Sequence, residues 1–152
     1  MVILDGKNCN ATPLAECKLH KSPVTTLSYH PRGDFLISTD RRGMVELWHP
    51  ATGRWDPDRA TLSVSTFQIT YKFKMQTDLF HMVKEKAWAL SATISPDGNL
   101  WAVMGSDLKV RVFHIATGML KRVYSETLES ADTLQVGTIS LSLISTLTST
   151  RL

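Results

Sequence analysis

Residues 43–53 read Gly-Met-Val-Glu-Leu-Trp-His-Pro-Ala-Thr-Gly, and residues 108–118 read Leu-Lys-Val-Arg-Val-Phe-His-Ile-Ala-Thr-Gly. Aligned from their first residues, the two stretches share a Val, an aromatic residue, a His and a closing Ala-Thr-Gly. Continued upstream without a gap, the same alignment places His30-Pro31-Arg32-Gly33 over Ser95-Pro96-Asp97-Gly98. A register shared through turns and apolar positions indicates an internal repeat.

Each copy of the repeat predicts short strands separated by turns. Alternating apolar residues indicate half-buried strands, and clusters of Gly, Pro and Asp indicate turns. A unit of four short strands repeated along a chain is typical of a β-propeller. We therefore expect an all-β fold of about two four-stranded blades, near residues 14–76 and 86–126. The predicted strands are 24–29, 35–39 and 44–48 in the first copy and 90–94, 100–104, 110–115 and 120–124 in the second.

The segment between the copies is longer than a propeller needs. Because propeller repeats are about 40–45 residues long, the separation between His30 and its counterpart Ser95 requires about 20 inserted residues. Within the insertion, apolar and polar residues alternate at 67–74, which predicts a strand. Thr77-Asp78 predicts the start of a short amphipathic helix. We expect this helical insertion to brace a blade rather than to form a site.

The composition is that of a globular protein. The 152 residues are 43% hydrophobic and 20% charged, which excludes a disordered chain and a polytopic membrane protein. A formal net charge of +3 is too small to indicate nucleic-acid binding by itself. Cys9 and Cys17 are too few for a disulfide framework, and no signal or membrane-spanning segment is recognisable. We expect a soluble intracellular protein with free thiols and no membrane contact.

No pattern typical of a catalytic, cofactor or metal site is present. The histidines lack metal-ligand spacing, neither cysteine has a CxxC partner, and GxGxxG, GxxxxGK[ST] and GxSxG are absent. His81-x-x-x-Glu85 would place two polar side chains on one helix face, which we expect to be solvated. The tryptophans are not interleaved with basic residues, so core packing is a better interpretation than base stacking. We expect no catalytic residues, no metal and no cofactor.

Both copies resemble WD40 repeats. The first copy carries this resemblance at 19–24, 30–33 and 43–48, and the second at 95–98 and 105–113. The inserted Thr77-Asp78-Leu79-Phe80 narrows it to the WD-repeat region of a family of nuclear, spliceosome-associated cyclophilins, because ordinary WD40 repeats lack this segment. The resemblance covers about residues 1–129, in which 3–7 would be the tail of a preceding blade.

The resemblance implies five structural positions, His20, Asp40, Trp48, Asp107 and Phe113. WD40 blades carry a turn Asp six residues before the aromatic residue. Asp107 satisfies this spacing relative to Phe113, whereas Arg42 occupies it relative to Trp48. Glu85 stands in the second copy at the position of His20, so the hydrogen-bonded tetrad of the family is expected to be incomplete in both blades. Asp40, eight residues before Trp48, either accepts a hydrogen bond from the His20 ring or simply starts the hairpin turn.

The resemblance also implies a function. The chain would be a fragment of a protein-interaction scaffold, nuclear and acting in mRNA splicing with spliceosomal protein partners. Two alternatives remain open, a peptidyl-prolyl cis-trans isomerase and a weak RNA-binding module. A cyclophilin domain needs its own barrel of more than about 100 residues, for which this sequence leaves no room. Four lysines are expected to form a solvated face, or in a splicing protein to contact RNA or an acidic partner: Lys72, Lys74, Lys84 and Lys86.

The end of the chain departs from the family. Residues 130–152 are rich in Ser, Thr and Leu and match nothing in it. The alternation at 140–143 is compatible with an edge strand, or the tail is translated sequence from a truncated transcript or faulty gene model. Two blades without the neighbours that close a ring would leave apolar faces wet, including those of Leu27, Ile37, Val103 and Val112. We therefore expect the isolated chain to self-associate.

Overall fold

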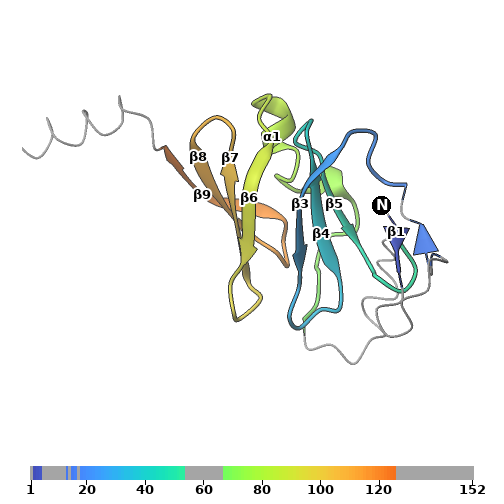
Figure 1. Ribbon diagram of the computed structural model, residues 1–152. Coiled ribbons are helices and arrows are strands. Elements are labelled where there is room, and N and C mark those ends of the chain that lie inside the picture. The colour runs from blue at the N-terminus through green and yellow to red at the C-terminus, as the bar shows by residue number, and fades with distance from the viewer. Residues whose placement is uncertain (1, 5–12, 14, 17, 54–66, 126–152) are drawn as a thin grey trace, which may run out of the picture.

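The computed structural model describes residues 2–4, 13, 15–16, 18–53 and 67–125. The predicted tail at 130–152 and both cysteines lie outside these residues, as does 54–66 of the insertion. Two antiparallel sheets stand side by side, each formed by one copy of the repeat (Figure 1). A short ribbon of β1 (Val2–Ile3) and β2 (Ala15–Glu16) lies beside the first sheet (Figure 1).

The first sheet contains β3 (Val24–Tyr29), β4 (Leu36–Asp40) and β5 (Val45–Trp48), in that order. Pro31 and Gly33 lie in the turn between β3 and β4, as predicted. Gly43 closes the next turn with φ of 79°, a conformation that a side chain disfavours. The predicted strand boundaries of the first copy are confirmed to within a residue.

The second sheet has four strands, β6 (Ala89–Ile94), β7 (Leu100–Gly105), β8 (Lys109–His114) and β9 (Met119–Ser125), paired in chain order. The alignment of the two copies places β3 over β6 and sets the start of β5 one residue from that of β8. Even the register irregularity recurs, at Val24/Thr26 against Asp40/Thr39 and at Ala89/Ser91 against Gly105/Met104. The internal repeat is therefore a repeat of three-dimensional structure.

The strand predicted at 67–74 is wrong. This segment joins no sheet and ends in a 3-10 turn, η1 (Lys74–Gln76). Thr70 instead donates hydrogen bonds from both its backbone N–H and its hydroxyl to the carbonyl of Ala116, in the turn between β8 and β9. The alternation reports packing, because Phe67, Ile69 and Tyr71 lie against the core while Phe73 is exposed. Three strands of the first blade lie in the described part of the chain, and the position aligned with β9, at residues 54–60, lies outside it.

The core runs through both sheets rather than lying inside each. It includes Ile37 of β4 and Val103 of β7, which are 2% and 0% exposed. Both were expected to lie on wet outward faces, but the two sheets cover each other there. Leu27 of β3 is 51% exposed, as expected. The close packing of β3 against β6 makes the two sheets one body (Figure 1).

Candidate functional site

A hydrogen-bonded network holds the loop before β3 against the first sheet. The His20 ring places Nδ1 3.2 Å from Oδ2 of Asp40 and Nε2 2.7 Å from Oγ of Ser38. Since a carboxylate only accepts, Nδ1 carries the hydrogen and Nε2 is free to accept from the Ser38 hydroxyl. The indole N–H of Trp48 donates to the same Ser38 oxygen at 3.1 Å. The predicted contact between His20 and Asp40 is therefore present, within a connected group of four residues that was expected to be incomplete.

Asp40 fulfils both of the alternatives left open by the sequence. Its Oδ2 faces His20, while its Oδ1 accepts the backbone N–H groups of Arg42 at 2.9 Å and Met44 at 3.0 Å. The carboxylate thus closes the hairpin turn and orients the imidazole at once. The sequence missed Ser38, although two-residue strand periodicity puts it on the same face as Asp40.

Ser38, His20 and Asp40 have the hydrogen-bond order of a catalytic triad, but not its accessibility. A nucleophilic serine must reach a substrate carbonyl and needs an adjacent oxyanion hole. Ser38 is 0% exposed, and its oxygen already accepts the Trp48 N–H. The His20 and Asp40 side chains are 5% and 3% exposed. The geometry therefore performs a structural role, which is to fix the loop and turn to the sheet.

The second sheet holds its turn with different residues. Arg111 of β8 is 0% exposed and makes two hydrogen bonds to Asp107, of 2.9 Å from Nη1 and 2.5 Å from Nη2. Its Nε donates to Nδ1 of His81 at 3.1 Å. The Arg111 guanidinium holds the pKa of Asp107 below its usual range. Neither Arg111 nor His81 was predicted, because the repeat alignment pointed to Glu85.

His81 belongs to α1 (His81–Lys84), the helix of the insertion. One turn later, Glu85 is 3.4 Å from Nζ of Lys109. The helix face predicted to be solvated therefore contacts the second sheet through both of its polar residues. The imidazole contributed by the loop before β3 in the first sheet is contributed by α1 in the second.

The residues aligned between the two copies explain why the second blade has a different network from the first. Phe113 stands where the first sheet has Trp48, and it packs on Trp101 with ring centroids 5.5 Å apart. Because Phe113 has no N–H to satisfy, Val103 can take the place of Ser38. Gly105 takes the place of Asp40, and a Cβ there would collide with the Asp107 carboxylate and lie 2.6 Å from Arg111 Nη1. The glycine leaves room for the ion pair.

The inserted Thr77-Asp78 anchors α1 to the second sheet. The Asp78 backbone N–H donates to the carbonyl of Gly118, and its side chain accepts the N–H of Leu120 at 2.8 Å. Thr77 fills the space at Gly118, where φ is 65° and a Cβ would lie 2.5 Å from the Thr77 methyl group. Asp78 was predicted to start the helix, but α1 begins three residues later and Asp78 serves the contact between segments. These contacts agree with a bracing role for the insertion.

His30 joins the two sheets. The ring is 0% exposed, stacks on Phe35 at 4.4 Å and contacts Phe67 at 4.3 Å between centroids. Its Nε2 donates to the carbonyl of Gly98 at 2.8 Å, and its Nδ1 accepts the backbone N–H of Arg32 at 3.2 Å. Because Nδ1 accepts a hydrogen bond, it carries no proton and the ring is neutral, and burial lowers the pKa of His30.

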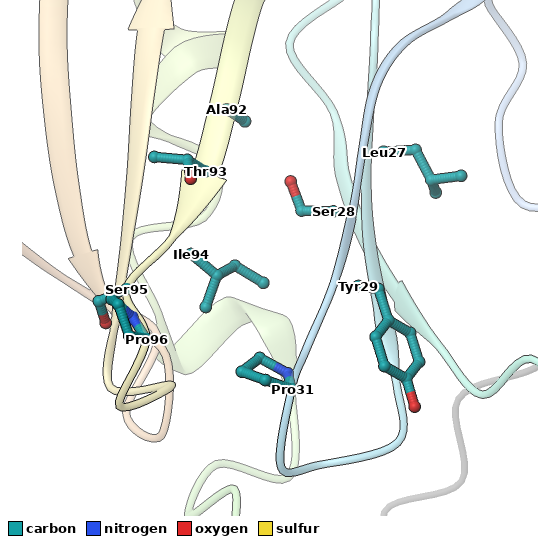
Figure 2. Close-up of a pocket in the computed structure, with 9 residues that line it drawn as sticks. All are labelled: Leu27, Ser28, Tyr29, Pro31, Ala92, Thr93, Ile94, Ser95 and Pro96. Carbon is teal, nitrogen blue, oxygen red and sulfur yellow. The ribbon is translucent and has the colours of Figure 1, made fainter.

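A groove of about 400 Å³ lies between β3 and β6 (Figure 2), and two of its lining residues, Ala92 and Ile94, also pack against the core. Among its lining residues only Tyr29 is ionisable, and its hydroxyl donates to Asp34 at 2.9 Å. The Ser28 hydroxyl points into the groove, while Leu27 and Tyr29 point to the other side of β3 (Figure 2). Its lining residues are Leu27, Ser28, Tyr29, Pro31, Ala92, Thr93, Ile94, Ser95 and Pro96.

No group of three or more His, Cys, Asp or Glu side chains in 18–53 and 67–125, or in the short described pieces before them, is arranged to hold a metal ion. Among the same residues, no helix is long and apolar enough to cross a membrane.

Comparison with known families and proteins accounts for the repeat. Residues 11–49 match the model of the family described as WD domain, G-beta repeat, a range that includes the whole first network. The chain carries WD40 blades. The two sheets are accordingly the first and second blades of a partial β-propeller.

The similar proteins with curated names are isomerases. Peptidyl-prolyl cis-trans isomerase CYP71 of Arabidopsis thaliana is 32% identical over 88% of this chain and 20% of its own length. The human Peptidylprolyl isomerase domain and WD repeat-containing protein 1 is 35% identical over 88% of this chain and 19% of its own length. Peptidyl-prolyl cis-trans isomerase 9 of Schizosaccharomyces pombe is 36% identical over 66% of this chain and 15% of its own length. These proteins are homologues, and the chain spans about a fifth of their length or less.

Among solved structures, the computationally designed Ika4 protein superposes with a TM-score of 0.47 and 18% identity, over 74% of this chain and 54% of that one.

Proposed function

We propose that the chain is the protein-interaction part of a WD-repeat isomerase, and that it holds partner proteins for a prolyl isomerase domain rather than isomerising prolyl bonds itself. The observation that carries this proposal is the homology, because the human relative combines a peptidylprolyl isomerase domain with WD repeats in its name. Residues 11–49 of this chain match the WD-repeat model, so the chain corresponds to the WD-repeat part of such a protein. By the resemblance noted above, the site of action is the nucleus and the partners are spliceosomal proteins.

The polar networks support a scaffold. In each blade, buried side chains tie a loop or helix to the sheet, through His20 in the first and through Arg111 in the second. A surface built on fixed loops loses less conformational entropy when it binds a partner. The most triad-like group, around Ser38, is sealed from solvent.

A prolyl isomerisation assay separates the scaffold from the enzyme. Uncatalysed isomerisation takes tens to hundreds of seconds. We expect the purified chain to leave that rate unchanged, and any acceleration that scales with chain concentration would support the enzyme instead.

Affinity enrichment from nuclear extract tests the scaffold directly. We expect the chain to enrich splicing proteins over a tagged control, and over the Trp48→Ala variant, in which the first network is opened. Equal enrichment by all three would reject the proposal. Binding to RNA alone, with a steep loss as salt is raised, would favour the RNA-binding alternative.

A further inference from the structure

A group of cations on the loop side of the blades has no acidic partner within the described chain. We propose that this cationic patch, formed by Arg41 and Arg42 in the turn after β4 and by Lys84 and Lys86 at the end of α1, docks an Asp- and Glu-rich segment of a partner protein. The inference rests on the scaffold function proposed above and deepens it by naming the surface and the chemistry of the partner.

Packing between the two blades brings together the two chain segments that carry the cations. Arg41 and Arg42 lie in the turn between β4 and β5, while Lys84 ends α1 and Lys86 follows it. At Gly43, a Cβ would collide with the carbonyl oxygen of Ala87, so the turn rests directly on the segment after the helix. Arg41 extends over Trp88, with its guanidinium carbon 5.6 Å from the ring centroid.

The four side chains are exposed, and no carboxylate of the described residues neutralises them. Every ion pair found in that part of the chain uses other cations, namely Lys18, His20, His49, Lys74, Lys109 and Arg111. The nearby carboxylates are already engaged, since Glu85 pairs with Lys109 and Asp107 with Arg111. A positive field at this face is what a surface that meets an acidic partner requires.

The lysines grouped in the sequence analysis differ in whether they form ion pairs. Lys74 lies 2.6 Å from Glu46 and donates to the carbonyl of Val45 at 2.7 Å, so it is occupied within the first blade. Lys84 and Lys86 make no ion pair within the described ranges and are joined by two arginines from the other copy of the repeat. The cation cluster is therefore a product of the fold, because the turn after β4 and the segment around α1 are far apart in the sequence.

An acidic peptide fits this surface better than a nucleic acid. Proteins that bind single strands without sequence preference offer aromatic faces for base stacking. Trp88 is half-buried and covered by Arg41, so its ring is not open beside the charges. Arginine guanidinium groups, in contrast, present paired donors that match a carboxylate bidentately.

Binding of a fluorescein-labelled peptide of alternating Glu and Ser to the full chain tests the proposal, with a Gln and Ser peptide and a single-stranded oligonucleotide as further probes. We expect the Glu peptide alone to bind appreciably. The double variant Arg41→Gln/Arg42→Gln should weaken binding about tenfold. The control Lys121→Gln/Arg122→Gln removes the same charge from β9 and should change binding less than twofold. Self-association of the chain would affect both variants, so the difference between their affinities for the peptide reports on the patch.

Lys84→Gln separates the patch from the stability of the first blade, because it keeps the contact between Arg41 and Trp88 and should still weaken binding severalfold. Absence of binding by the wild type, or equal losses in the patch and control variants, would overturn the proposal. Tighter binding of the oligonucleotide, lost in the patch variant, would make this a nucleic-acid surface instead. In the nuclear-extract experiment, enrichment by wild type and Arg41→Gln/Arg42→Gln alike would reject the patch and leave the scaffold standing.

Discussion

The two blades fix their turns with different chemistry on the same backbone. The first uses hydrogen bonds among His20, Ser38, Trp48 and the carboxylate of Asp40, whereas the second uses the ion pair of Asp107 and Arg111. In both, an imidazole from outside the sheet completes the network. The two copies therefore share a structural role, the attachment of a loop or helix to a turn of the sheet, although different residues perform it.

The largest expected effect concerns exposed apolar side chains on β3 and β6. Leu27 of β3 is 51% exposed and Leu90 of β6 is 55% exposed. Exposed apolar side chains on strands favour association between copies. We therefore predict that the isolated chain self-associates at micromolar concentration, and that Leu27→Ser and Leu90→Ser each reduce it. Sedimentation velocity measures this directly, and a monodisperse species of 17.0 kDa for the wild type would contradict it.

Breaking the network of the second blade has the next largest effect. Arg111→Met leaves the Asp107 carboxylate without its buried partner and His81 without its donor. We expect the free energy of unfolding to fall by about 3 kcal/mol, the lower part of the range for breaking a buried pair, because Asp107 is partly exposed. Urea denaturation at one fixed protein concentration measures it. A loss below about 1 kcal/mol would show that the ion pair is dispensable.

A glycine position tests whether the two networks can be exchanged. Gly105→Ala places a methyl group against both partners of the Asp107–Arg111 pair. We expect a loss of about 1.5 kcal/mol in the free energy of unfolding, from overpacking. The same substitution in the Arg111→Met background should cost less, because the crowded guanidinium is gone. Equal costs in the two backgrounds would argue that Gly105 is required for another reason.

The contact between the blades should respond to pH. His30 is buried as a neutral ring with a lowered pKa, so below about pH 6.5 the unfolded chain binds a proton that the folded chain resists. Stability is therefore complete above that pH and decreases as pH falls through 6.5 toward the lowered value, by at most about 1.4 kcal/mol per pH unit. Urea midpoints between about pH 5 and pH 7.5 measure the slope. The slope should flatten in His30→Phe, and an unchanged slope would assign it to another group.

The sequence predicted much of the fold because one constant alignment of the two copies carried turns and strands together. It predicted the contact of Asp40 with His20 because both residues lie at positions that the WD40 resemblance marks as structural. It failed at 67–74, where alternation reflects packing of Phe67 and Ile69 on the core without strand pairing. It also missed Arg111 and His81, because their contact is distant in sequence and depends on where the insertion places α1. Such a contact leaves no mark on local periodicity.

Ser38 accompanies Trp48 in the first blade, whereas Val103 accompanies Phe113 at the aligned positions of the second. If the serine is there to accept the indole N–H, the two substitutions should be coupled, and a double-mutant cycle measures this coupling most directly. Ser38→Val leaves the Trp48 N–H buried without an acceptor, whereas in Ser38→Val/Trp48→Phe that N–H is absent, as in the second blade. We predict that the double variant loses about 1 kcal/mol less in the free energy of unfolding than the two single variants lose together. This difference is the net value of a buried hydrogen bond. Losses in the free energy of unfolding that add to within about 0.3 kcal/mol would contradict the account.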